Sequence, residues 1–188
     1  MTQTSERLAE VVAQRIERLQ KQYLTRNSYG IAMLANLRHA VGKLPGTIPA
    51  IWELTIDGIG GYTQGGAPSK EEMAVHDVFT LYAIHQQSKS EPMHIRNRLL
   101  GQAVRDLENS GHTETAVRRR FNAIITSSTY QELTYHLRGL ISQFHSEGIT
   151  LDYRVLVENL FLVQFAEFVP GVKMTWARSY YSNTQEQK

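Results

Sequence analysis

Apolar residues recur every three or four positions along almost the whole chain, which is the spacing of an amphipathic α-helix. The first such stretch follows Ser5, a residue type that caps helix starts. We expect Ser28 to cap a second helix, which ends at Gly42, where a left-handed glycine can terminate it. Strict alternation of apolar and polar residues, which indicates a strand, is not sustained in any segment. The pattern therefore predicts an all-α fold.

An unusually apolar predicted helix begins after Ser69, which forms a capping-box pattern with Glu72. Such a helix belongs at the centre of a bundle, where its neighbours bury it. We therefore expect Phe79, on this helix, to lie in the core. Apolar side chains cover most of the circumference, and the polar positions form only a narrow stripe of His76, Thr80 and Gln87.

The segment before this helix is predicted to be irregular. Pro45, Gly46 and Pro49 frame a bend. A short apolar piece follows, in which we expect Trp52 to be buried. Residues 57–68 then contain five glycines, which makes this segment the longest predicted loop.

The second half of the chain is predicted to form further helices, each with its own start or stop signal. These signals are stops at Gly111 and Gly148, caps at Thr113 and Asp152, a capping box of Thr129 with Glu132, and a break at Pro170 and Gly171. The sequence shows no internal repeat and no second domain. We therefore predict a single-domain bundle of about seven or eight helices over residues 1–181, followed by a frayed polar tail over residues 182–188.

Composition excludes several classes of protein. The chain has no cysteine, which rules out a disulfide scaffold, a thiol nucleophile, an iron–sulfur cluster and a zinc ribbon. Charged residues are spread over the first thirty positions, so these positions do not form the apolar core of a signal peptide. No run approaches the roughly 18 apolar residues that a membrane span requires. We therefore expect a cytoplasmic protein with no membrane partner.

The sequence contains no motif typical of an enzyme or a metal site. Its seven histidines lack the spacing of a helical zinc site, so we expect His85 and Gln86 to bond to backbone groups. The glycine-rich loop lacks the Gly-Lys-Ser or Gly-Lys-Thr ending of a phosphate-binding loop. Neither Ser88 nor Ser127 lies in a nucleophile elbow. We expect no catalytic residue, no metal and no cofactor.

Positive charge is concentrated in the middle of the chain, although the formal net charge is only +2. Residues 93–145 contain seven arginines, no lysine and four acidic residues, whereas the flanking segments are balanced or slightly acidic. A guanidinium group pairs with phosphate through two hydrogen bonds, whereas an ammonium acts as a point charge. The distribution therefore favours phosphate binding, with a solvated face as the alternative.

Helical geometry spreads the triplet Arg118, Arg119 and Arg120 over the outer half of one predicted helix. At about 100° per residue, Arg119 points away from the buried stripe of that helix, and its two neighbours flank the stripe. The triplet therefore forms one broad basic surface. Arg96 and Arg98 precede another helix and extend this basic surface in the same interpretation. The alternative for this pair is that both are simply solvated side chains of a loop.

On the next predicted helix Arg138 lies off the apolar stripe, with Tyr135, Ser142 and His145 along the same side. We expect Arg119 and Arg138 to be exposed on a shared face of two successive helices. A basic track with aromatic platforms is typical of proteins that hold single-stranded nucleic acid. Amphipathic packing of an exposed tyrosine is the alternative.

Nine short segments form a recognisable set through their order and spacing. They are LANLR (34–38), PGTIPAIW (45–52), LYAIHQQ (81–87), MH (93–94), LGQAV (100–104), VRRRFN (117–122), HLRGL (136–140), LDY (151–153) and WARSYY (176–181). Together they resemble the CasB family, the small subunit of the type I-E Cascade complex in bacterial CRISPR defence.

This resemblance implies an all-helical, non-catalytic subunit that packs with another copy of itself, among the other Cascade subunits and the guide RNA. In the family, basic side chains help to hold the strand of target DNA that is displaced when the guide pairs, which stabilises the R-loop. The matching basic positions are Arg38, Arg118, Arg119, Arg120 and Arg138. Two alternatives stay open here, a pure protein scaffold of the same complex and an unrelated helical adaptor.

Overall fold

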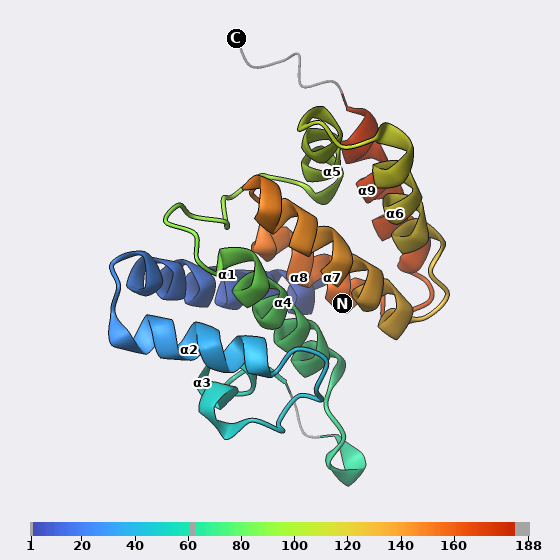
Figure 1. Ribbon diagram of the computed structural model, residues 1–188. Helices are drawn as coiled ribbons and strands as arrows, with labels where there is room; N and C mark the ends of the chain where they lie inside the picture. Colours follow the sequence, from blue (N-terminus) through green and yellow to red (C-terminus); the bar gives the residue numbers. More distant parts are fainter. Residues whose placement is uncertain (1, 61–62, 183–188) are drawn as a thin grey trace.

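The computed structural model describes residues 2–60 and 63–182 as helices joined by loops (Figure 1). These ranges hold nine α-helices and two short 3-10 helices without a β-strand, so the all-α prediction is confirmed. The α-helices are α1 (Thr2–Leu24), α2 (Ser28–His39), α3 (Trp52–Thr55), α4 (Lys70–Gln86), α5 (Leu100–Asn109), α6 (Glu114–Thr126), α7 (Tyr130–Glu147), α8 (Tyr153–Leu162) and α9 (Val169–Tyr181). The 3-10 helices are η1 (Pro49–Ile51) and η2 (Gln64–Gly66). Residues 183–188 of the predicted frayed tail lie outside the described residues.

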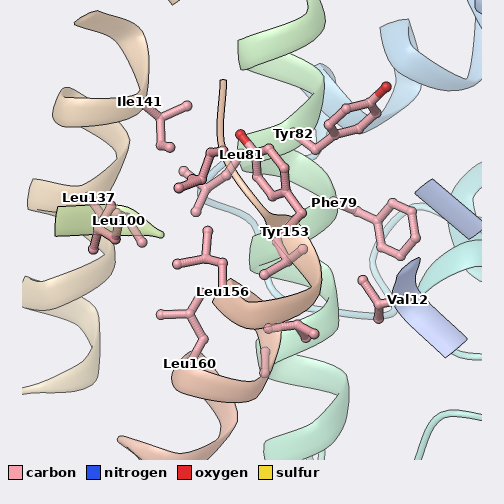
Figure 2. Close-up of a cluster of buried hydrophobic side chains, with 14 of the residues drawn as sticks. Val12, Phe79, Leu81, Tyr82, Leu100, Leu137, Ile141, Tyr153, Leu156 and Leu160 are labelled. Carbon is pink, nitrogen blue, oxygen red and sulfur yellow. The ribbon is translucent and has the colours of Figure 1, made fainter. Parts of the chain in front are cut away.

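Helix α4 is central, as its apolar circumference predicts. It packs against α1, α2, α3, α7 and α8 (Figure 1). Phe79 is fully buried, and Figure 2 shows its ring beside Val12 of α1. Of the expected polar stripe, His76 and Thr80 are buried by neighbouring helices, whereas Gln87 at the end of the helix is exposed. The Thr80 hydroxyl is satisfied within α4, where it donates to the Asp77 carbonyl at 2.9 Å.

Helix α5 packs against α6, α7 and α9, and its contact with α9 is unusually close (Figure 1). The N–H of Gly101 donates to the Ser179 hydroxyl at 3.2 Å. A Cβ at position 101 would collide with the backbone of Trp176 and Tyr180. A glycine is therefore required here so that the two helices can approach.

The capping residues predicted for α4, α7 and α8 are confirmed, but the capping box predicted for α7 is incomplete, because Glu132 accepts the N–H of Ser128 and not that of Thr129. Ser69 and Glu72 form a reciprocal capping box at the start of α4, with bonds of 2.8 and 3.1 Å. Thr129 accepts a backbone N–H at the start of α7, and that helix ends at Gly148 with a left-handed φ of 68°. The Asp152 carboxylate accepts two backbone N–H groups at the start of α8.

Four predicted boundaries are wrong. Helix α2 ends at His39 with Ala40 as its cap, so Gly42, although left-handed with a φ of 76°, lies beyond the helix end. Ser5 lies inside α1 and is buried, and its hydroxyl donates to Glu158 of α8 at 3.2 Å instead of capping a helix. Helix α2 is capped by Asn27, one residue before Ser28. Pro170 starts α9 rather than interrupting α8, because a proline in the first turn lacks only an N–H that has no partner within the helix.

Trp52 is exposed, which corrects the prediction that it is buried. Its side chain is 46% exposed, and its indole N–H donates to the Gly46 carbonyl at 3.1 Å. The short helix α3 and the preceding turn can present only one side to the core. Ile51 and Leu54 occupy that side, so the indole lies over the neighbouring loop.

A buried polar chain connects α4 to the start of α8. His85 Nε2 lies 2.7 Å from the Ile149 carbonyl, so this nitrogen carries the proton and donates it. His85 Nδ1, 2.9 Å from the Tyr153 hydroxyl, then accepts a hydrogen bond from it. Gln86 bonds to the backbone of Glu91 and Met93, so the expected structural role of both side chains is confirmed.

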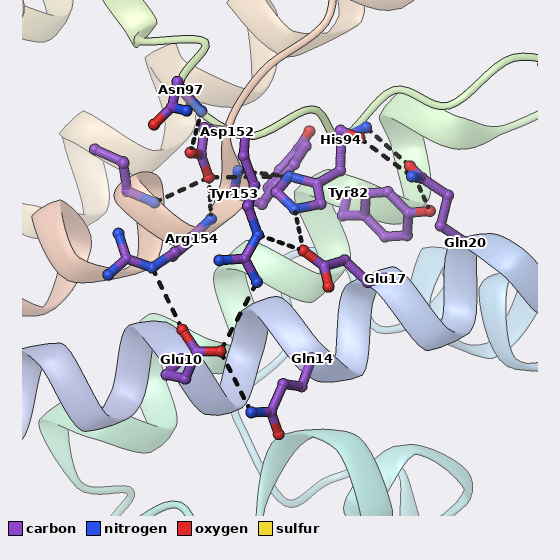
Figure 3. A network of polar contacts seen from close by, with 12 residues as sticks. Glu10, Gln14, Glu17, Gln20, Tyr82, His94, Asn97, Asp152, Tyr153 and Arg154 are labelled. Atoms are coloured by element: carbon purple, nitrogen blue, oxygen red, sulfur yellow. Dashed lines mark hydrogen bonds and ion pairs between the residues drawn. The ribbon is translucent and has the colours of Figure 1, made fainter.

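The segment between α4 and α5 is held against α1 and α8 by a second set of buried bonds (Figure 3). Gln20 of α1 accepts the N–H of His94 at 2.9 Å and donates to its carbonyl at 3.1 Å. His94 Nδ1 accepts the N–H of Tyr153 at 3.2 Å, and Asp152 accepts the N–H of Asn97 at 2.7 Å. This segment therefore has defined partners although it contains no α-helix.

Replacing Phe79 with alanine should lower the free energy of unfolding by about 3 to 5 kcal/mol, because the change removes buried apolar surface and leaves a cavity. Urea denaturation measures this quantity. Trp52→Ala is the control and should cost less, since that ring is half-exposed. An unchanged denaturation midpoint for Phe79→Ala would contradict the placement of this ring.

Protonation of His85 should make stability depend on pH. Burial lowers the pKa of His85 from 6.5 to about 4. As the pH falls, His85 is therefore protonated in the unfolded chain before it is protonated in the folded protein. The stabilisation is complete above about pH 6.5 and decreases by up to about 1.4 kcal/mol per pH unit towards pH 4. Urea denaturation at several pH values in this range measures the free energy of unfolding. This free energy should depend less steeply on pH in His85→Gln than in the wild type. Burial also lowers the pKa of His94, so the stability of the variant should still depend on pH to some extent. Equal slopes in both proteins would exclude His85 as the titrating group.

Candidate nucleic-acid interface

Helix α6 carries the arginine triplet on its outer side, as helical geometry predicts. Val117, Phe121 and Ile124 form the buried side of α6, which packs against α7. Arg118, Arg119 and Arg120 are all exposed. Their guanidinium groups differ, however, in the partners they have within the protein.

Arg118 is neutralised by its surroundings. Its guanidinium lies 2.5 Å from Glu114 and 3.4 Å from Glu108, and its Nε donates to the Tyr180 hydroxyl at 2.9 Å. The hydrogen bond to Tyr180 and the two carboxylates raise the pKa of this guanidinium. Arg118 therefore links α6 to α5 and α9, and little of its charge is left for a ligand.

Arg119 and Arg120 are available for an external anion. Within the described residues, Arg119 has neither a hydrogen bond nor an ion pair. Arg120 makes only a long hydrogen bond of 3.4 Å to the Ala116 carbonyl of its own helix. Neither charge is compensated by a carboxylate, so both favour binding of a phosphate.

Arg138 of α7 faces the same region as Arg120. These two residues line one hollow of about 270 Å³, together with Tyr135, His136 and Gly139. The Arg138 guanidinium carbon lies 5.8 Å from the centre of the Tyr135 ring. The structure thus brings Arg120 of α6 and Arg138 of α7 to one hollow. Arg119, for which a face shared with Arg138 was expected, does not line this hollow.

Arg138 is half-buried, whereas full exposure was expected. The physical reason is its position beside the end of α2. A Cβ at Gly42 would lie 3.5 Å from Arg138 Nη1, and both residues line a narrow cleft that also contains Asp77 of α4. Arg38 lies in the last turn of α2, is half-buried, and has no side-chain partner within the described ranges.

Arg96 and Arg98 are both held by carboxylates. Arg96 Nε donates to Glu17 of α1 at 2.7 Å, and Glu10 lies 3.8 Å away. Arg98 forms an ion pair with Asp106 of α5. Neither residue lines the hollow on α6 and α7. Because these pairs satisfy both guanidinium groups within the protein, we leave them out of the proposed contact surface.

Of the three polar residues expected beside Arg138, only Tyr135 presents its side chain freely. Its ring is 65% exposed. His145 instead donates from Nδ1 to the His85 carbonyl at 3.0 Å, and Ser142 donates to the Arg138 carbonyl at 3.0 Å. The hydrogen-bond donors of Ser142 and His145 are therefore used within the protein, whereas the Tyr135 hydroxyl has no hydrogen-bond partner within the described residues.

Within residues 2–60 and 63–182, no group of three histidine or acidic side chains could hold a metal ion. In the same part of the chain, no helix is long and apolar enough to cross a membrane.

Comparison with known proteins identifies the family. A sequence profile described as "CRISPR-associated protein Cse2" matches residues 33–181. The chain belongs to the Cse2 family. CasB from Thermobifida fusca has a similar structure, with a TM-score of 0.79 and 30% identity over 93% of this chain and 98% of that one. The resemblance to the CasB family is thereby confirmed.

A second solved structure shares the fold. It is a CRISPR-associated protein of the Cse2 family from Thermus thermophilus, with a TM-score of 0.67 and 22% identity over 94% of this chain and 97% of that one. Among curated proteins, none matches the chain.

Most of the segments that carry the family resemblance meet one another inside the protein. The LGQAV segment contacts WARSYY where Gly101 approaches Ser179. The MH and LDY segments meet through a parallel bridge between His94 and Leu151, and LYAIHQQ joins them through His85. These segments therefore preserve the packing of the Cse2 fold.

Sequence reasoning missed which arginines are paired. Glu114 lies four residues before Arg118, a spacing at which opposite charges attract on a helix, so this partner was readable. Glu108 and Tyr180 approach Arg118 only through the packing of α5 and α9. No local signal in the sequence indicates those two contacts.

Proposed function

We propose that this protein is a non-catalytic small subunit of the type I-E Cascade complex and holds nucleic acid through a basic face on α6 and α7. The basic face consists of Arg119, Arg120, Tyr135 and Arg138, with Arg38 as a neighbouring positive charge. Arg118 lies beside it but is paired with Glu114 and Glu108. The observation that carries the proposal is the uncompensated charge of Arg120, which lines one hollow with Arg138, and of Arg119, the preceding residue on α6. Membership of a CRISPR-associated family supports the assignment.

The ligand of the basic face is the DNA strand displaced when guide RNA pairs with its target. The guide–target duplex is about as stable as the DNA duplex that it replaces, so modest contacts to the displaced strand shift the balance. Guanidinium groups supply such contacts to phosphates irrespective of base sequence. The guide RNA reads the sequence, and the protein stabilises the R-loop.

Assembly with other Cascade subunits, the guide RNA and a second copy of this chain requires surfaces besides the basic face. Leu44, Trp52 and Met174 have exposed apolar side chains that do not line the hollow on α6 and α7. Exposed apolar side chains of this kind suit contacts between proteins. This separation supports distinct assembly and DNA contacts in a cytoplasmic complex.

A pure protein scaffold is the second candidate function. The observation that favours it is Arg118, an arginine of α6 that binds two carboxylates and a tyrosine of this protein. In that case the remaining arginines would pair with acidic side chains of other subunits. An unrelated helical adaptor is excluded, because the chain belongs to the Cse2 family.

Replacing both Arg119 and Arg138 with alanine should weaken binding to single-stranded DNA. The affinity of this double variant should also depend less on salt concentration. Each lost phosphate contact should lower the slope of log affinity against log salt concentration by about 0.7, equally for unrelated sequences. Fluorescence anisotropy of labelled oligonucleotides measures this slope. Arg18→Ala is the matched control, because Arg18 is exposed but paired with Glu53 at 3.0 Å. Its slope should equal that of the wild type.

In the assembled complex, the double variant should weaken target-bound R-loops more than it weakens copurification with the other subunits. Stability should change little at the exposed Arg119, by less than about 0.5 kcal/mol. Normal target binding at physiological salt combined with failed copurification would mean that these arginines contact protein. The scaffold function would then replace the proposed one.

The purified chain should cleave neither nucleic acids nor nucleotides. The expectation follows from the missing phosphate-loop and metal-site spacings in the sequence. Assays with divalent metal ions test it directly. Cleavage that persists through purification and disappears on a point substitution in this chain would show that it is an enzyme.

A further inference from the structure

Tyr135 is an exposed aromatic residue without a structural partner for its hydroxyl. The ring is 65% exposed, and within the described residues its hydroxyl makes no hydrogen bond. Trp52 is exposed as well, but its indole N–H is bound to Gly46. The buried Tyr82 and Tyr153 use their hydroxyls in the core network. Within the fold the Tyr135 ring contacts the His136 ring edge to face, at 5.4 Å between centres, and the Arg138 guanidinium, and it stays mostly exposed beside both.

The space around Tyr135 fits a flat ring. The hollow beside it measures about 270 Å³. Gly139, one turn further along α7, forms part of its wall, and a Cβ at this position would find nothing within 4 Å. The Tyr135 ring is therefore not covered from the side of the following turn.

Positive charge flanks the same ring. Arg138 lies 5.8 Å from its centre, and Arg120 lines the hollow from α6. The acidic residue near this end of α7, Glu132, is engaged at the helix start, where it accepts the N–H of Ser128 at 2.8 Å. His136 is 4.0 Å from the same carboxylate. The local charge therefore favours an anionic ligand with an aromatic part.

We propose that Tyr135 is a stacking platform for an unpaired base, which makes the basic face selective for single-stranded nucleic acid over duplex. Arg120 and Arg138 bind the phosphates on either side of the stacked base. The bases of a duplex are already stacked and paired, so they cannot reach a ring on a helix surface. Any unpaired base can stack, because every base has a π-face. This inference rests on the proposed function, since it concerns the same surface.

Binding of purified full-length variants to three labelled probes tests the inference. The probes are oligodeoxythymidine, an abasic oligonucleotide of the same length, and a duplex. Tyr135→Ala should bind oligodeoxythymidine about 5- to 100-fold more weakly than the wild type, the range for loss of one stacked aromatic residue. Its affinities for the abasic strand and the duplex should equal those of the wild type. Tyr135→Phe should retain wild-type affinity for all three.

Two readouts separate stacking from charge. The salt dependence of binding should be the same in Tyr135→Ala and the wild type, because no phosphate contact is lost. In Tyr135→Trp, the indole fluorescence should be quenched by oligodeoxythymidine and not by the abasic strand, after subtraction of the same titration on the wild-type protein. Circular dichroism should show unchanged helix content in every variant.

Equal affinity of wild type and Tyr135→Ala for oligodeoxythymidine would overturn the stacking role. A loss of equal size on the abasic strand would overturn it too, because that probe has no base to stack. Neither result contradicts the proposed function, because that function is tested at Arg119 and Arg138. If the double arginine variant binds as tightly as the wild type, the proposed function fails instead.

Discussion

The structure depends on a buried hydrogen-bonded chain that runs from the Ile149 carbonyl through His85 to the Tyr153 hydroxyl. All three groups lie in the core, where an unpaired polar atom costs about 1 to 3 kcal/mol. Satisfying them fixes the end of α7 and the start of α8 against α4. His85 must stay neutral for this arrangement, because its two nitrogens donate and accept at the same time. The position of α7 in turn sets the position of Arg138 beside the end of α2.

On this framework, ion pairing decides which arginines can bind a ligand. Arg96 and Arg118 have carboxylate partners from other helices, whereas Arg119 and Arg120 have none within the described residues. Surface exposure alone does not distinguish them, since Arg118 and Arg119 are both exposed neighbours on one helix. A free guanidinium binds a phosphate with a more favourable free energy than a paired one, because the paired one must first lose its contact with a carboxylate. The basic face is therefore smaller than the arginine count indicates.

The sequence was informative wherever a feature depends on nearby residues. The caps at Ser69 and Asp152 and the central place of α4 follow from spacing within one helix, and these predictions are confirmed. The burial of Ser5 against Glu158 and the exposure of Trp52 depend on how distant segments meet, so local patterns predicted both incorrectly. The same holds for the site. Helical geometry placed the triplet on the outer side of α6, and the spacing made Glu114 readable as a partner of Arg118. Only the packing of α5 and α9 adds Glu108 and Tyr180.

The central claim is that the face formed by α6 and α7 contacts the displaced DNA strand. Photocrosslinking tests it most directly, with target DNA whose displaced strand carries iodouracil, bound to the complete complex and analysed by mass spectrometry of the crosslinked peptides. The account predicts crosslinks to this chain at Tyr135 and at peptides from α6 and α7. Crosslinks confined to other subunits, or to the side of α1 that holds Arg96, would contradict it.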